Sequence, residues 1–210
     1  MHISSIRYFL NNLRVALAIT LATAAGITAS HADGLPDPGT DIVNGCTALV
    51  GTDPQNDFFS PKGVTWGIVV RANGTVEHID QSFAAAKAGN MPVFVSPHDH
   101  GRQFEGSGAD WIKQYKRYKR YINDIALQLR KRGIHKVILT GMSANLCTES
   151  RTPELIEQGF EAMAVSDATT AAQLPGPDGD QAASVTFRMI ASHVADTITV
   201  VTAIKTTSAN

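Results

Sequence analysis

The chain has 210 residues, of which 43% are hydrophobic and 18% are charged, and its formal net charge is −1. This length and composition suit one globular domain with a sizeable core. A net charge this close to zero argues against a protein that binds nucleic acid or anionic membranes through its overall charge. We interpret the basic stretch at 113–120 as a solvated surface.

Residues 1–32 predict a secretory signal peptide. Arg7 and Arg14 are the only charged residues of this stretch, and the apolar run that follows them is too short for a comfortable membrane span. Ser30 and Ala32 supply the small residues of a cleavage site. We therefore expect cleavage after Ala32 and a secreted or periplasmic protein without stable membrane association. An uncleaved N-terminal anchor is the alternative.

The remaining chain predicts alternating strands and helices. An arm at 33–46 precedes a domain at 47–205, and the Ser/Thr-rich tail at 206–210 is expected to fray. Within the domain, short apolar runs predict strands and amphipathic spacing predicts helices. Strands are predicted at 47–52, 92–96, 135–140, 162–165 and 197–201, and helices at 76–88, 124–132, 148–159 and 180–193. This alternation indicates a three-layer α/β fold, with a mostly parallel, Rossmann-like sheet and helices on both faces.

Polar side chains follow the first two predicted strands. Asp53 comes directly after the first strand, where catalytic groups gather in parallel sheets, so it is a candidate acid or base. It could instead be a turn residue before Pro54, and Asp57 competes for the same role. His98 and His100 follow the second strand, where they either line a cleft or hold a metal. A two-residue spacing is weak support for a metal, so we predict none.

Cys147 lies where the third of these strands turns into a helix. The first amides of a helix carry a partial positive charge, which stabilises a thiolate, so we expect the pKa of Cys147 to be lowered. The alternative is a small buried hydrophobic residue. The other cysteine, Cys46, precedes the first strand and would lie at the opposite edge of the sheet. We therefore expect no disulfide and assign Cys46 to packing.

Two segments together resemble the isochorismatase-like cysteine hydrolases. Residues 48–58, ALVGTDPQNDF, are similar to the first-strand signature of that family, and residues 141–150, GMSANLCTES, are similar to its nucleophile signature. The resemblance covers roughly 47–194. It implies the family's fold and an Asp–Lys–Cys triad, in which the Cys147 thiolate forms a covalent intermediate and Asp53 transfers the proton.

The resemblance places the lysine of the triad less firmly. In the family its ammonium keeps the carboxylate ionised. This chain is shorter than such relatives between Ser96 and Asn123, and counting back from Asn123 places the lysine at Lys116. Lys113 and Lys119 are rivals, and an incomplete triad is the alternative.

The same resemblance implies the surroundings of the nucleophile. Backbone amides of Ser143 and Cys147 would form the oxyanion hole, next to a non-proline cis peptide between Met142 and Ser143. The residues expected to line the substrate pocket are Phe58, His98, Tyr118 and Asn145.

Together these features predict an exported cysteine hydrolase that cleaves a C–N bond in a small-molecule amide, without metal or cofactor. A homo-oligomer is expected, because the family often self-associates. Two alternatives stay open. One is a metal-assisted, nicotinamidase-type hydrolase that uses His98 and His100. The other is a non-catalytic binding protein on the same fold.

Overall fold

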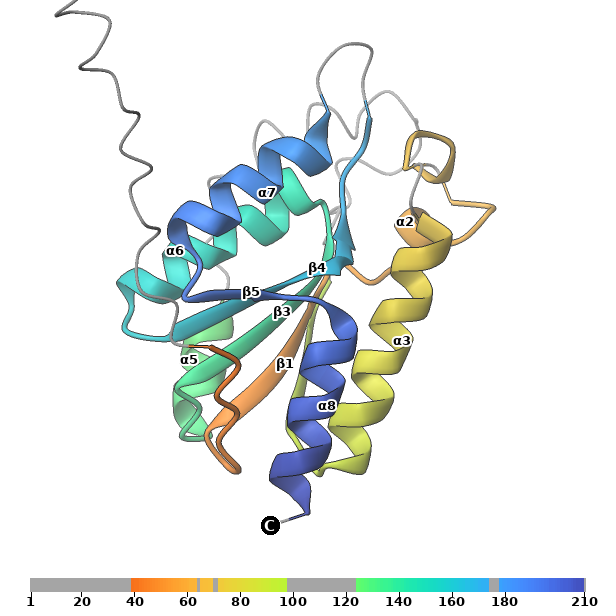
Figure 1. The fold of residues 1–210 in the computed structure, drawn as a ribbon. Coiled ribbons are helices and arrows are strands. Elements are labelled where there is room, and N and C mark those ends of the chain that lie inside the picture. Colours follow the sequence, from red (N-terminus) through yellow and green to blue (C-terminus); the bar gives the residue numbers. More distant parts are fainter. Residues whose placement is uncertain (1–38, 64, 70–71, 98–123, 174–177, 210) are drawn as a thin grey trace, which may run out of the picture. The chain divides into compact units, whose positions relative to one another are not determined.

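The computed structural model describes residues 39–63, 65–69, 72–97, 124–173 and 178–209. Within these residues the chain forms five strands: β1 (Thr47–Thr52), β2 (Val93–Ser96), β3 (Lys136–Met142), β4 (Glu161–Thr170) and β5 (His193–Ala195). They pair in the order β2-β1-β3-β4-β5, and every pairing is parallel (Figure 1). The predicted α/β fold is therefore confirmed, and β1 spans the residues predicted for it.

Helices cover both faces of this sheet (Figure 1). The helices against one face are α3 (Ala72–Ala88) and α8 (Thr197–Ser208). Those against the other face are α5 (Ile125–Lys131), α6 (Glu149–Glu157) and α7 (Gly179–Ile190). Three short helices lie between the larger elements: α2 (Asn56–Phe59), η1 (Trp66–Ile68) and the π-helix η3 (Ala144–Thr148). All of these elements belong to one compact unit, Asp37–Asn210.

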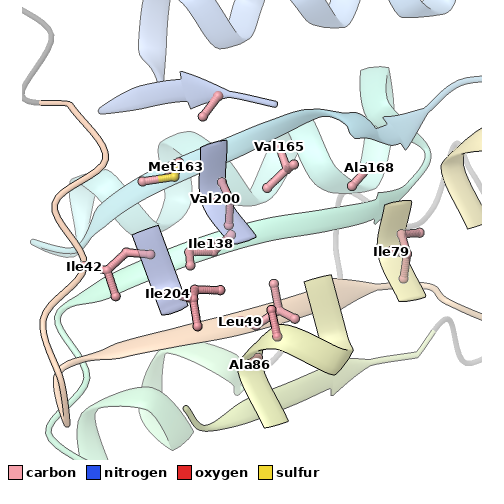
Figure 2. Packing of buried hydrophobic residues seen from close by; sticks show 12 residues of the cluster. Ile42, Leu49, Ile79, Ala86, Ile138, Met163, Val165, Ala168, Val200 and Ile204 are labelled. Atoms are coloured by element: carbon pink, nitrogen blue, oxygen red, sulfur yellow. The ribbon is translucent and has the colours of Figure 1, made fainter. Parts of the chain in front are cut away.

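The core follows the alternation of side chains along each strand. Leu49, Ile138 and Val165 pack with side chains of α3 and α8, as Figure 2 shows. Val50 and Leu139 point to the opposite face and pack with side chains of α5 and α6. Because both faces of β1 and β3 are covered, nearly every residue of these strands is buried. This explains why their sequences are continuous apolar runs.

The C-terminal segment differs from the prediction. Residues 197–201 begin α8, so the strand predicted there is wrong. The Asp196 carboxylate accepts a hydrogen bond of 2.8 Å from the Thr199 backbone N–H and caps the helix, whose Val200 and Ile204 are buried. The last strand is instead β5, which begins at the end of the predicted helix. Since α8 continues to Ser208, the tail that was expected to fray is helical up to that residue.

The segment before β1 is attached to the core. Ile42 is buried in the same cluster as Leu49. The Lys136 ammonium lies 3.1 Å from the Asp41 carboxylate and 2.8 Å from that of Glu161. The predicted signal peptide lies outside the described residues, and none of the described helices is long and apolar enough to cross a membrane.

Candidate active site

Asp53 lies at the carboxyl end of β1, as the sequence predicts. Its side chain is fully buried, and its φ of 49° places it in the left-handed region. Few residues other than glycine adopt this conformation, although aspartate tolerates it better than most. The Asp53 N–H donates to the carbonyl of Ser96, the last residue of β2, at 2.9 Å. The backbone thus turns sharply at the end of β1 and holds the carboxylate inside the protein.

The next strand, β3, ends beside Asp53. Gly141 pairs with Thr52, and its φ is 113°. A Cβ atom at Gly141 would collide with the carbonyl oxygen of Thr52 and lie 2.7 Å from its nitrogen. Only glycine therefore allows the two backbones to approach this closely. The Met142–Ser143 peptide bond that follows is cis, as the family resemblance implies.

Cys147 lies in the π-helix that follows this cis bond. The Thr148 N–H donates to the Ser143 carbonyl at 3.1 Å, and the Leu146 N–H donates to the same oxygen at 3.0 Å. Such wide helical turns are rare and frequently occur at functional sites. The Cys147 side chain is 1% exposed, and the regular helix α6 begins only at Glu149. The nucleophile candidate therefore lies on a π-helix and not on the first turn of an α-helix.

The charge state of the Cys147 thiol differs from the expectation. Burial raises the pKa of Cys147 well above its usual range, and the negative charge of the nearby Asp53 carboxylate raises it further. A hydrogen bond from the Ser143 backbone and the positive charge of Arg151 act in the opposite direction. The predicted lowering of this pKa is therefore wrong, because desolvation outweighs the helix amides. Cys147 and Asp53 form a thiol–carboxylate pair in the free protein.

Arg151 is a residue near the thiol that the sequence analysis did not single out. It lies on α6, four residues after Cys147, and its side chain is 2% exposed. Its Nη2 donates to the Ser96 hydroxyl at 2.6 Å. The signal that could have found it is the i, i+4 spacing, which places both residues on the same helical face.

The other predicted site residues fall into two groups. Ser143 donates through its hydroxyl to the Asn145 side-chain oxygen at 2.8 Å, so both lie next to the nucleophile. Phe58 is buried in an apolar cluster with Met142, the residue before the cis bond. The remaining predicted residues, Lys116, Tyr118, His98 and His100, lie outside the described residues, as do the rivals Lys113 and Lys119.

The described residues define one chemical capability, and they do not test the metal-assisted alternative, because His98 and His100 lie outside them. A thiol next to a carboxylate can transfer its proton and become a nucleophile. The nearby backbone N–H of Ser143 can stabilise negative charge on sulfur or oxygen. Among the described residues, no three His, Cys, Asp or Glu side chains lie close enough together to hold a metal ion. Cys46 and Cys147 are both free thiols, at opposite ends of the sheet.

Comparison with known proteins identifies related sequences. A family model described as the isochorismatase domain matches residues 111–200. The isochorismatase family protein YecD of Escherichia coli is 42% identical over 52 residues, which are 25% of this chain and 28% of YecD. The matched segment thus spans less than a third of that curated relative.

Solved structures share the fold. A cysteine hydrolase from Pseudomonas syringae pv. phaseolicola matches with a TM-score of 0.67 at 18% identity, over 79% of this chain and 95% of that chain. A nicotinamidase from Staphylococcus aureus matches with a TM-score of 0.53 at 16% identity, over 72% of this chain and 99% of that chain. At these identities the likeness is one of fold. The chain is therefore similar to isochorismatase-family proteins in sequence over residues 111–200, and it shares their fold.

Proposed function

We propose that the protein is an exported cysteine hydrolase that cleaves the C–N bond of a small amide through a thioester on Cys147. The observation that carries this proposal is the buried pair of the Cys147 thiol and the Asp53 carboxylate, with the Ser143 backbone N–H directed at the sulfur. A nucleophile, a proton acceptor and an anion-stabilising donor are the three components that acyl transfer requires.

The first step forms the nucleophile. Burial and the charge of Asp53 keep the Cys147 thiol protonated in the free protein. When the amide carbonyl arrives, the thiol proton passes to the Asp53 carboxylate as the sulfur attacks the carbonyl carbon. An S–H bond breaks, O–H and S–C bonds form, and the carbonyl oxygen takes up the negative charge. This timing avoids a stable thiolate in a buried site.

The second step expels the amine. The backbone amides of Ser143 and Cys147 are proposed to stabilise the oxyanion. Asp53 then gives its proton to the leaving nitrogen as the C–N bond breaks, which leaves an acyl thioester. Water, deprotonated by Asp53, hydrolyses this thioester and restores the thiol. By family resemblance, Lys116 would keep the Asp53 carboxylate ionised between turnovers.

Three considerations favour an amide substrate. The fold is shared with a protein described as a nicotinamidase, an enzyme that acts on a small aromatic amide. An exported enzyme is also poorly placed to meet an intracellular biosynthetic intermediate such as a vinyl ether. An acid–base pair next to a thiol is suited to protonating an amine leaving group, which amide hydrolysis requires.

Ammonia release from a panel of small amides tests the proposal. Cys147→Ala should lower kcat by at least about a thousandfold, because no covalent intermediate can form. Cys46→Ala is the matched control, since it removes the other free thiol at the far end of the sheet and should leave turnover unchanged. Intact-mass spectrometry during turnover should detect an acyl adduct on the parent protein and none on Cys147→Ala. Amide turnover that persists in Cys147→Ala would refute the proposal.

Export is tested separately. The basic start, the apolar stretch and the small residues before Asp33 support cleavage of a signal peptide. Protein recovered from outside the cytoplasm should have the intact mass of a chain that begins at Asp33. A mass that still includes Met1 would contradict export by this route.

A further inference from the structure

Arg151 is a charged residue in the interior of the protein. It is 2% exposed, and arginine is almost never this buried unless its guanidinium is paired. It lies on α6 one helical turn after Cys147, and Thr152 and Leu155 of the same helix are also buried. A permanent positive charge is therefore held next to the nucleophile candidate, where salt screens it little.

Ser96 connects Arg151 to Asp53. The Ser96 hydroxyl accepts from Arg151 Nη2 at 2.6 Å, and the Ser96 carbonyl accepts from the Asp53 N–H at 2.9 Å. Ser96 also pairs with Thr52, the residue before Asp53. One residue at the end of β2 thus joins the helix that carries the cation to the strand that carries the carboxylate.

The charges around the thiol oppose each other. Among the described residues, the charged groups that act on Cys147 are Asp53, at the end of β1, and Arg151, on α6. Asp53 raises the pKa of the thiol, whereas Arg151 lowers it. When the proton moves from sulfur to Asp53, negative charge moves toward the sulfur, and a fixed cation beside the sulfur stabilises the product of this step.

We propose that Arg151 is a positioning residue of the active site, which holds Ser96 against Asp53 and stabilises the thiolate that forms on Cys147. This inference rests on the proposed function of the Cys147–Asp53 pair. It assigns Arg151 a role beyond that of a packing link between α6 and β2. Arginine suits the role because its guanidinium stays charged when buried and carries several donors that can hold Ser96.

Alkylation of Cys147 by iodoacetamide tests the inference without any substrate. The full chain with Cys46→Ala leaves a single thiol, and its rate of alkylation is measured as a function of pH. Arg151→Met and Arg151→Gln should react about tenfold more slowly near neutral pH and shift the rate profile to higher pH, because the cation is lost. Arg151→Lys should stay within about threefold of the parent, because it restores a charge.

The outcomes separate a role in chemistry from one in folding. Each variant is first checked for a cooperative thermal transition. A folded neutral variant that reacts as fast as the parent overturns the inference, and so does an Arg151→Lys variant as slow as the neutral ones. If neither neutral variant folds, Arg151→Lys decides alone: a rate within about threefold supports the inference, and a tenfold loss overturns it. Since alkylation requires no amide, a failed amide panel would remove the proposed function while this result stands.

Discussion

Gly141→Ala should strongly destabilise the protein, because the backbone of β1 leaves no room for a Cβ atom at Gly141. The new Cβ would collide with the Thr52 carbonyl oxygen and lie 2.7 Å from its nitrogen and 2.8 Å from its carbonyl carbon. All three atoms are backbone, so no side chain can move away. Overpacking of this kind costs about 1–3 kcal/mol, and a non-glycine residue at positive φ costs about 1–3 kcal/mol more. We therefore expect a loss of about 2–6 kcal/mol in the free energy of unfolding.

Urea unfolding followed by circular dichroism measures this loss. Gly74→Ala is the matched control, because Gly74 lies within α3 and a Cβ there would meet nothing within 4 Å. That substitution should stabilise the protein by about 0.5–1 kcal/mol, since alanine is the better helix former. A Gly141→Ala variant as stable as the parent would show that the strand ends are not held together at Thr52.

Three further predictions concern titratable groups. Asp53→Asn should abolish amide turnover yet speed alkylation of Cys147, because removing the carboxylate's charge lowers the pKa of the thiol. Each unit by which this pKa falls gives about tenfold more thiolate but makes that thiolate about threefold less nucleophilic, so alkylation should be about threefold faster per unit. Slower alkylation would show that Asp53 acts on the thiol only as a base. Because the pKa of Cys147 is raised by burial, the unfolded chain loses this proton first. The contribution of the protonated Cys147 thiol to the free energy of unfolding is thus fully present below about pH 8.5 and is lost above it, by up to about 1.4 kcal/mol per pH unit. Cys147→Ala should remove this decrease when the free energy of unfolding in urea is measured as a function of pH. Asp196→Ala should cost about 1 kcal/mol by removing the cap of α8, while Asp196→Asn should cost little. The Thr199 hydrogen bonds lower the pKa of Asp196, so the advantage of the parent over Asp196→Ala should be present at neutral pH and shrink in acid, and an advantage independent of pH would contradict this reasoning.

The sequence predicts the fold well where burial is continuous and fails where local preference and tertiary context disagree. The residues of β1 are buried on both faces, so an apolar run identifies the strand without ambiguity. All five residues at 197–201 are β-branched, which favours a strand, yet they form a helix. The Asp196 cap and the spacing of Val200 and Ile204 were the signals for a helix, and packing against the sheet decides the outcome.

The site was predictable in its positions more than in its electrostatics. The strand ends place Asp53 and Cys147 at the same edge, because neighbouring parallel strands end together. The raised pKa of Cys147 could not be predicted, since it depends on how deeply the thiol is buried and on its distance from a carboxylate far away in sequence. Arg151 was missed for a similar reason, because a charged residue in a helix is ordinarily exposed.

The order of the strands also affects how the protein folds. Strand β1 pairs with β2, about 45 residues later, and with β3, about 90 residues later. Such high contact order makes folding slow, because long loops must close before these pairings contribute any stability. A nascent chain that ends before residue 136 contains Asp53 but lacks the strand that completes its environment. We therefore expect the carboxylate and the sulfur to acquire their native surroundings only after β3 has paired with β1.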